Sequence, residues 1–356
     1  MQLPLKVHAN LRHVRRLFFG QGTVPSTAYR RDILCPEEKT EVRPSVFLED
    51  QLEKVTGSPA ASTRKAEIEA AIRRDATHAA TIAYYIRNAV LFDGSIYAGQ
   101  LRHVVADKSL LPTSATRAVD LRTAGIASSF IGTKYFGHWL TDDCLQYLLA
   151  DRYGRPLCLS RPVYSLGHQE EYERYFNQDW APLHRARIEE LVLFQDFAQN
   201  SLKTERYHVL RSRVRAQLTG RKSPFVYLRR GSSGAARMIN NEDEILNALT
   251  KKGFVVVDIL SDSLNCILSH LIDAKIVVSI EGSHVAHCCF SVPYSSGLVL
   301  LQPCDMFTVV HKGWADSLSI NFGFVVGERA GQGYYFPLSD LLDTVDLMLD
   351  RADKYT

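Results

Sequence analysis

The sequence predicts an α/β protein of two domains, of which the C-terminal one is a parallel sheet covered by helices on both faces. Two observations support this. The chain has 356 residues, which is long for one hydrophobic core. In its C-terminal half, short β-branched apolar runs alternate with amphipathic segments. We expect residues 1–203 to form the N-terminal domain and residues 204–356 the C-terminal domain.

The N-terminal half carries weaker signals of a second α/β domain after an irregular first segment. AVLFDGSIYAG (89–99) predicts a hairpin, because an apolar run meets Asp-Gly and then alternation. IASSFIG (126–132) predicts a strand. HWLTDDCLQYLLADRYG predicts an amphipathic helix that ends at Gly154. PLCLS (156–160) and IEELVLF (188–194) predict strands, and the Arg-rich stretch at 204–218 predicts a helix.

The C-terminal half alternates more clearly, and this alternation predicts a Rossmann-like domain over about residues 204–337. The predicted strands are PFVYLRR (224–230), FVVVD (254–258), KIVVSI (275–280) and GLVLLQP (297–303). The predicted helices are NNEDEILNALTKKG (240–253), SLNCILSHLIDA (263–274), the short GSHVAHCCF (282–290) and LSDLLDTVDLMLDR (338–351). We expect the last helix, residues 338–352, to pack back on the N-terminal domain.

Charge is distributed unevenly along a chain whose formal net charge is only +3. Ten basic residues fall between positions 203 and 237, against one acid, Glu205. The low net charge argues against a general polycation. The local run of cations predicts an anionic ligand or partner.

Cysteine content and hydropathy predict a cytoplasmic protein. The chain has seven cysteines, an odd number, and no two of them form a CxxC pair. This indicates free thiols in a reducing compartment. The first twenty residues lack the apolar core of a signal peptide, and no stretch approaches the roughly 20 apolar residues of a membrane span. Residues 11–19, LRHVRRLFF, are basic and apolar. They fit either contact with the inner membrane face or a solvated helix or arm.

Three segments carry candidate chemistry, since ligands bind beyond the carboxyl ends of strands in an open parallel sheet. The first is SIEGSH (279–284), where Gly282 allows close backbone approach, and Ser283 and His284 begin a helix that suits a phosphate. Glu281 would repel phosphate, so we expect it to accept hydrogen bonds from ribose or another pair of hydroxyl groups. The alternative is an ordinary strand-to-helix turn.

A metal site is a further alternative at this segment. His284 and His287 are three residues apart and share a helix face, with Glu281 just before them. Zinc needs three or four protein ligands, and no distant Cys/His cluster supplies the others. We therefore expect no metal here.

The second segment is YLRRGSSGAAR, in which Arg229 and Arg230 end a strand and Arg237 follows a Gly/Ser loop. Arginines in this position can clamp a diphosphate, and the alternative is a solvated run of charge. The third segment is FGHWLTDD (136–143). His138 and Asp142 share a helix face, where either can accept a proton. Asp143 is a third candidate acid, although it points elsewhere. The alternative is an acid pair that serves the helix dipole.

In this order the three segments resemble glycosyltransferase family 61. That family includes plant arabinosyl- and xylosyltransferases, animal protein O-linked N-acetylglucosaminyltransferases and bacterial capsule-type enzymes. The matching positions, over about residues 90–300, are His138 and Asp142 of H-x-x-x-D, Arg229, then Arg237, Ile239, Asn241 and Glu242, and finally Gly282 and His287. One position departs from the pattern. Glu281 stands where the family's turn commonly has His, so a role of that His cannot be carried over.

The resemblance implies a GT-B-type fold, two Rossmann-like domains facing a cleft. It also implies inverting transfer without an essential metal or other cofactor. We expect transfer from a UDP-sugar to a glycan or lipid-linked glycan in bacterial surface-polysaccharide synthesis. Asp142 would be the base, with His138 as its partner or the alternative base. The nucleotide-sugar would be held by residues of the C-terminal domain: Arg229, Arg230, Arg237, Glu281, Gly282, Ser283, His284 and His287. The alternative function is a non-catalytic nucleotide- or polyanion-binding protein; nucleic acid is not the expected partner.

Overall fold

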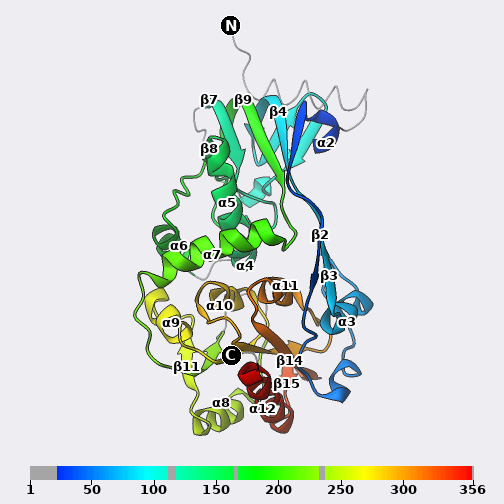
Figure 1. Ribbon diagram of the computed structural model, residues 1–356, viewed down its shortest axis with the longest axis vertical. Coiled ribbons are helices and arrows are strands. Elements are labelled where there is room, and N and C mark those ends of the chain that lie inside the picture. Colours follow the sequence, from blue (N-terminus) through cyan, green and yellow to red (C-terminus); the bar gives the residue numbers. More distant parts are fainter. Residues whose placement is uncertain (1–21, 111–117, 164–166, 232–236, 355–356) are drawn as a thin grey trace. The chain divides into compact units, whose positions relative to one another are not determined.

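The computed structural model describes residues 22–110, 118–163, 167–231 and 237–354, which form two compact units (Figure 1). The first unit comprises the described residues up to Glu38 together with His78–Tyr207. The second comprises Lys39–Thr77 together with the described residues from His208 onward. The basic segment 11–19, the candidate for membrane contact, lies outside the described residues.

The first unit contains a seven-stranded mixed sheet in the order β6-β5-β4-β9-β7-β8, with β1 also beside β4. Its strands are β1 (Arg30–Cys35), β4 (Thr81–Phe92), β5 (Ser95–Ala98), β6 (Leu101–Val104), β7 (Val119–Ile126), β8 (Arg155–Leu157) and β9 (Arg185–Gln195). Strand β4 is antiparallel to β1, β5 and β9, and only β7, β8 and β9 run parallel.

This sheet differs from the second Rossmann-like domain that we expected. The predicted hairpin is confirmed: Asp93 and Gly94, with φ of 46° and 75°, join β4 directly to β5. A two-residue turn forces its strands to be antiparallel, whereas a Rossmann-like sheet needs helical crossovers between parallel strands.

One long helical segment packs on this sheet and carries the candidate residues. The helices of the first unit are α2 (Val24–Thr27), η2 (Lys108–Leu110), α4 (Phe136–His138), the π-helical η3 (Trp139–Asp143), α5 (Cys144–Ala150), η4 (Asp151–Tyr153), α6 (Gln169–Phe176) and the start of α7 (Ser201–Arg215). The predicted helix end at Gly154, where φ is 122°, is confirmed. The strand predicted at 126–132 is wrong, because β7 ends at Ile126 and turns follow.

The second unit contains the predicted parallel sheet, in the order β11-β10-β12-β13-β14-β15. Its strands are β10 (Phe225–Arg229), β11 (Val255–Asp258), β12 (Ile276–Ile280), β13 (Gly297–Pro303), β14 (Asn321–Ala330) and β15 (Gly333–Tyr335). The first five are parallel, and β15 is antiparallel to β14. In chain order the parallel strands read 2-1-3-4-5, a doubly wound arrangement whose direction of winding reverses between β10 and β12.

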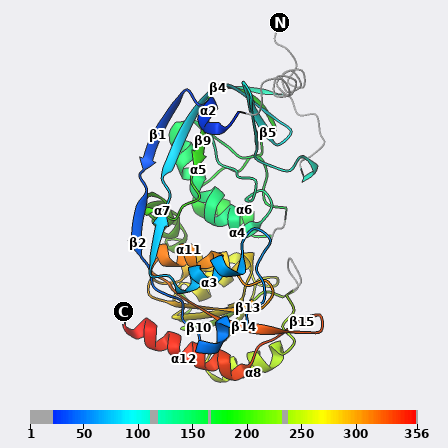
Figure 2. The ribbon, with the colours of Figure 1, turned by 90° about the vertical axis from the view of Figure 1, so that its right-hand side faces the viewer.

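Helices cover both faces of this sheet, with α9, α10 and α11 on one face and α8 and α12 on the other (Figure 1). Figure 2 shows α11 on one side of the strands and α8 and α12 on the other. The helices of the second unit are η1 (Glu49–Leu52), α3 (Arg64–Ile72), α8 (Glu242–Lys251), α9 (Leu264–Leu271), η5 (Ser283–Val285), α10 (Ala286–Ser291), α11 (Val310–Ser317) and α12 (Leu338–Lys354). A Cβ at Gly297 would lie 2.2 Å from Met348 Cγ, so α12 packs tightly on its own unit's sheet. Of the range that we assigned to the N-terminal domain, α12 contacts residues that belong to its own unit: Arg351 donates to Pro44 O at 2.7 Å, and Lys54 pairs with Asp340 at 2.8 Å.

The segment Lys39–Thr77 belongs to the second unit, although we assigned it to the N-terminal domain. The backbone N–H of Val46 donates to Phe322 O at 2.9 Å, and Gln51 Oε1 accepts the N–H of Val326 at 2.7 Å. Through these bonds, residues from the N-terminal part of the chain pair with backbone groups of β14. The two-stranded sheet of β2 (Glu38–Glu41) and β3 (Asp75–His78) carries the chain out to this segment and back.

Candidate active site

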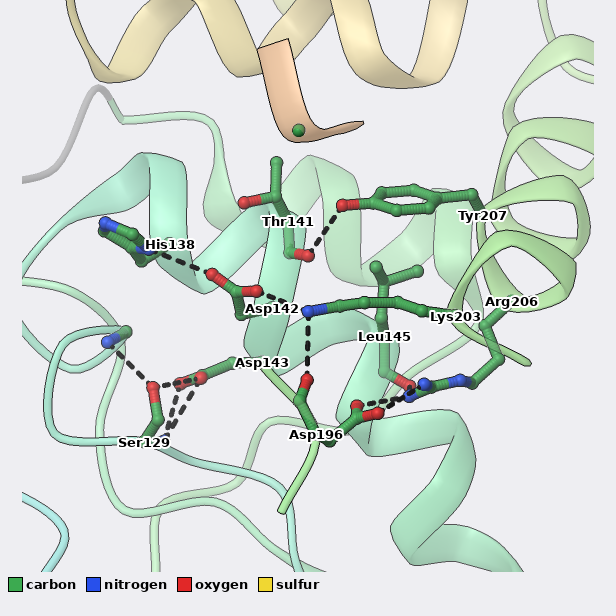
Figure 3. Close-up of polar contacts among 12 residues, drawn as sticks. Ser129, His138, Thr141, Asp142, Asp143, Leu145, Asp196, Lys203, Arg206 and Tyr207 are labelled. Carbon is green, nitrogen blue, oxygen red and sulfur yellow. Dashed lines mark hydrogen bonds and ion pairs between the residues drawn. The ribbon is translucent and has the colours of Figure 1, made fainter. Parts of the chain in front are cut away.

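His138 and Asp142 pair in the first unit, where the helix α4 passes into the π-helical segment η3. His138 Nδ1 lies 2.9 Å from Asp142 Oδ2 (Figure 3). A π-helical turn inserts one residue into the helical repeat and is frequent at functional sites. The side chain of His138 is 35% exposed, whereas that of Asp142 is 15% exposed. The imidazole is therefore the member of the pair that solvent or a ligand reaches first.

Lys203 is the third member of this site, and sequence reasoning missed it. Its ammonium, fully buried on α7, donates to Asp142 Oδ1 at 2.6 Å and to the carbonyl of Asp196 at 3.1 Å. Asp196 is itself held by Arg206 through two bonds of 2.7 Å. In the sequence Lys203 is one cation in a run of ten, and no local pattern separates it from its neighbours.

The electrostatics of this cluster settle which atoms can accept a proton. Burial alone would raise the pKa of Asp142, but the Lys203 ammonium and the bond from His138 outweigh it and lower the pKa to about 2. Asp142 is therefore ionised at neutral pH and can only accept hydrogen bonds. In the neutral imidazole of His138, Nδ1 must then carry the proton, which leaves the lone pair of Nε2 as the acceptor.

Asp143 lies apart from this pair, although it is the next residue. Its fully buried carboxyl group accepts the Ser129 N–H at 3.1 Å and the Ser129 hydroxyl at 2.6 Å (Figure 3). Ser129 Oγ in turn accepts the N–H of Gly132 at 3.0 Å. Burial raises the pKa of Asp143 well above its usual range. The side chain of Asp143 thus reaches back to the turns that precede α4, where its hydrogen bonds hold the backbone around Ser129 in place.

A second cluster lies in the second unit, at the carboxyl ends of β10 and β12, where the winding of the sheet reverses. Arg230 and Arg237 both donate to the backbone carbonyl of Glu281, at 3.1 and 2.8 Å. The carboxylate of Glu281 forms an ion pair with Arg237 and lies 3.7 Å from Nε2 of His311 on α11. Sequence reasoning missed His311, since nothing in its local sequence marks it.

The two arginines and the glutamate of this second cluster carry a net positive charge. Burial and the neighbouring Arg237 lower the pKa of Arg230 to about 10, so Arg230 stays charged at neutral pH. Burial would raise the pKa of Glu281, but His311 and Arg237 lower it below its ordinary value. Two guanidinium groups therefore lie beside one carboxylate. Such a site, at a topological switch point, suits an anionic ligand.

Most other residues of the SIEGSH segment are buried around this cluster, and Ser283 is half-buried. A Cβ at Gly282 would lie 3.0 Å from the His284 ring and 3.2 Å from Arg230, so this close approach requires glycine. His284 Nε2 lies 2.8 Å from Ser279 Oγ, whose hydroxyl donates to a carbonyl, so Nε2 carries the ring proton. Burial and Arg230 keep the pKa of His284 well below its ordinary value. Ser283 begins only a single 3₁₀ turn, and His287 is fully buried on α10.

Arg229 binds different partners from Arg230. Its guanidinium donates to Glu242 at 3.1–3.2 Å and lies 3.9 Å from Asp258. It therefore ties β10 to the start of α8, and the structure does not bring it to Glu281.

Most cations of the basic stretch have internal partners. Arg211 donates to the carbonyls of Cys289 and Val292, and Arg215 donates to the carbonyl of Ser291. Lys203, Arg206 and Arg229 pair with carboxylates. The run of charge is therefore not one exposed basic face.

The described part of the chain contains neither a metal-ligand cluster nor a membrane-spanning helix. Among those residues no group of three or more His, Cys, Asp or Glu side chains is placed to hold a metal ion. No helix there is both long and apolar enough to cross a membrane.

A known protein family matches the segment that holds the first cluster together with Arg230, Arg237 and Glu281 of the second. The family model described as Glycosyltransferase 61 matches residues 136–299, from the start of α4 into β13. A search of curated proteins found no match.

Proposed function

Since the chain belongs to glycosyltransferase family 61 and is a glycosyltransferase, we propose that it is an inverting, metal-independent enzyme. Its donor is a UDP-sugar, and its acceptor is a glycan or lipid-linked glycan of a bacterial surface polysaccharide. In this proposal the second unit binds the donor and the first unit supplies the base.

The observation that carries the mechanism is that Asp142 contacts both His138 Nδ1, at 2.9 Å, and the Lys203 ammonium, at 2.6 Å, which keeps its carboxylate ionised. It fixes the proton of His138 on Nδ1 and so presents Nε2 as the acceptor. We therefore assign the base to His138, which was the alternative base expected from the sequence, and make Asp142 the residue that orients it. A carboxylate with a pKa of about 2 is a poor base at neutral pH.

Inversion requires one in-line displacement at the anomeric carbon of the donor. The acceptor oxygen forms the new bond to that carbon while its proton passes to Nε2 of His138. The bond from the anomeric carbon to the phosphate oxygen breaks, and the leaving diphosphate keeps the electron pair. An imidazolium forms beside Asp142, whose negative charge stabilises it.

The cluster of Arg230, Arg237 and Glu281 supports donor binding. Its net positive charge is buried, so it stabilises the charge that develops on the leaving diphosphate more strongly than an exposed arginine would. Arg229 is assigned to the fold instead, because two carboxylates already hold it.

The alternative, a polyanion-binding protein, would need the 203–237 stretch on the surface. The internal partners of its arginines argue against this. A salt titration separates the two functions, because polyanion binding falls steeply as salt rises.

For location we propose the cytoplasm at the inner membrane face. None of the seven cysteines, all of which lie in the described residues, takes part in a disulfide, which fits a reducing compartment. Vesicle sedimentation with and without residues 1–21 tests the membrane contact.

The experiment is a turnover screen against UDP-, GDP- and CMP-sugars, followed by His138→Gln. We expect a loss of turnover of about 100-fold or more with nucleotide affinity within twofold, because the base does not touch the donor. The control is His103→Gln, a histidine on β6 of the same unit. Full activity of His138→Gln would refute the assignment of the base.

A further inference from the structure

Helix α7 presents three buried polar side chains to the helical segment that carries the proposed base. Lys203, Arg206 and Tyr207 are spaced i, i+3 and i+4 along α7, so they share one face of that helix. None of the three residues is more than 1% exposed. All three belong to the first unit and reach toward the segment that follows His138 (Figure 3).

Tyr207 and Lys203 fix the two ends of Asp142. The Tyr207 hydroxyl donates to the carbonyl oxygen of Thr141 at 3.0 Å. That oxygen lies in the planar peptide group that joins Thr141 to Asp142, so the bond fixes the backbone from which the Asp142 side chain starts. The Lys203 ammonium binds the carboxylate end through Oδ1, at 2.6 Å. With both ends fixed, Oδ2 stays at its contact with His138 Nδ1.

The π-helical turn η3 depends on contacts of this kind. The N–H of Cys144 donates to the carbonyl of Trp139, five residues back, where an α-helix would use a carbonyl four residues back. Such turns are rare, so we expect neighbouring elements to stabilise this one. Tyr207 does so within the turn, and Arg206 donates to the carbonyl of Leu145 at 3.2 Å just beyond it.

We propose that Tyr207 is a positioning residue of the transferase, which fixes Asp142 and, through it, the imidazole of His138. The inference rests on the proposed function, in which His138 is the base. Tyr207 is fully buried and its hydroxyl binds backbone, so it acts through the turn and not on the substrate. A reacting group must be held within about 0.5 Å of its productive position, and contacts of this second kind supply that precision.

The kinetic test is Tyr207→Phe, which removes the hydroxyl and keeps the ring in the core. A displacement of 1 Å can reduce a rate about 100-fold. Lys203 still binds Asp142 in this variant, so we expect a smaller displacement and a fall in kcat of about tenfold. The KM for the donor should stay within twofold, because the proposed donor cluster lies in the second unit.

The matched control is Tyr147→Phe. Tyr147 is also a buried tyrosine of the first unit, and its hydroxyl accepts the N–H of Asp179 at 3.0 Å. This variant therefore loses a phenol bond to backbone, as Tyr207→Phe does, and should keep kcat within twofold. A tenfold loss in both variants would indicate a general effect of lowered stability and would overturn the positioning role.

A double-variant cycle tests whether Tyr207 acts through the base. In the His138→Gln background, Tyr207→Phe should change the residual kcat less than twofold, since no imidazole remains to be positioned. A further tenfold loss in that background would show that Tyr207 acts by another route and would overturn the inference.

Hydrogen exchange, followed by NMR on the full chain, tests the turn without turnover. The amide of Cys144 makes the π-helical bond, so Tyr207→Phe should speed its exchange at least fivefold, whereas Tyr147→Phe should leave it within twofold. Unchanged exchange in Tyr207→Phe would overturn the inference whatever the kinetics. Faster exchange together with full activity of His138→Gln would count against the proposed base and not against the stabilisation of the turn by Tyr207.

Discussion

Replacing Lys203 by methionine keeps a long side chain and removes the ammonium on which Asp142 depends. The carboxylate then keeps only His138 as a partner, and the carbonyl of Asp196 loses a donor. We expect this single change to lower the free energy of unfolding of the first unit and to leave the second unit unaffected.

The pKa shift of Asp142, to which Lys203 makes the largest favourable contribution, sets the scale of this loss. The partners of Asp142 lower its pKa from 3.8 to about 2. A tenfold change in an acid dissociation constant corresponds to about 1.4 kcal/mol, so ionised Asp142 contributes about 2 kcal/mol to the stability of the fold. The lost bond to Asp196 adds about 1 kcal/mol. The total, about 3 kcal/mol, is at the lower end of the cost of breaking a buried ion pair.

The pH dependence has a definite sign. The pKa of Asp142 is lower in the folded state than in the unfolded state, so its contribution is fully present above about pH 4. It is lost as the pH falls from about 4 to about 2. The stability difference between the wild-type protein and Lys203→Met should therefore narrow over that interval.

Urea unfolding, followed by tryptophan fluorescence at several pH values, measures the free energy of unfolding of both proteins. Two of the three tryptophans, Trp139 and Trp180, are buried in the first unit and report on it. The control is a double-mutant cycle with Asp142→Asn, in which the double variant should lose less than the sum of the single losses. Additive losses, or a pH-independent difference, would refute the coupling of Lys203 to Asp142.

Close contacts and charges give three further predictions. Gly132→Ala places a Cβ 2.1 Å from the Asp143 carboxyl group and should cost about 1–3 kcal/mol in the same unfolding assay. Glu281→Gln removes the negative charge beside Arg237; calorimetry should show several-fold tighter binding of UDP, together with a lower melting temperature. Arg229→Met should lower stability by at most about 1 kcal/mol, since the side chain is 38% exposed, and should leave UDP affinity unchanged.

The second unit could be predicted well because its strands are buried on both faces. KIVVSI and GLVLLQP are continuous apolar runs, and every residue of β12 and β13 is buried. The first unit was harder to predict. Its strands pair mostly antiparallel. The run IASSFIG has the composition of a strand, but it forms turns in which the N–H and hydroxyl of Ser129 donate to the buried Asp143 carboxyl group.

The candidate site was predictable only where it is local in sequence. His138 and Asp142 are four residues apart, so helix geometry alone predicts their contact. Lys203 lies 61 residues from Asp142, and no spacing rule joins them. The sequence also could not predict that Arg229 and Arg230 have different partners. Neighbouring residues on a strand point to opposite faces of the sheet, and only the fold determines what each face contacts.

The division of the chain constrains how the protein folds during synthesis. The segment Lys39–Thr77 leaves the ribosome early, yet Gln51 bonds to Val326, 275 residues later. At about 5–20 residues per second, Gln51 waits about 14–55 s for that partner. The first unit, whose described residues end at Tyr207, can fold in this interval with the early segment looped out of it. No single cut in the gene separates the two units, and a chaperone that holds residues 39–77 would act in this window.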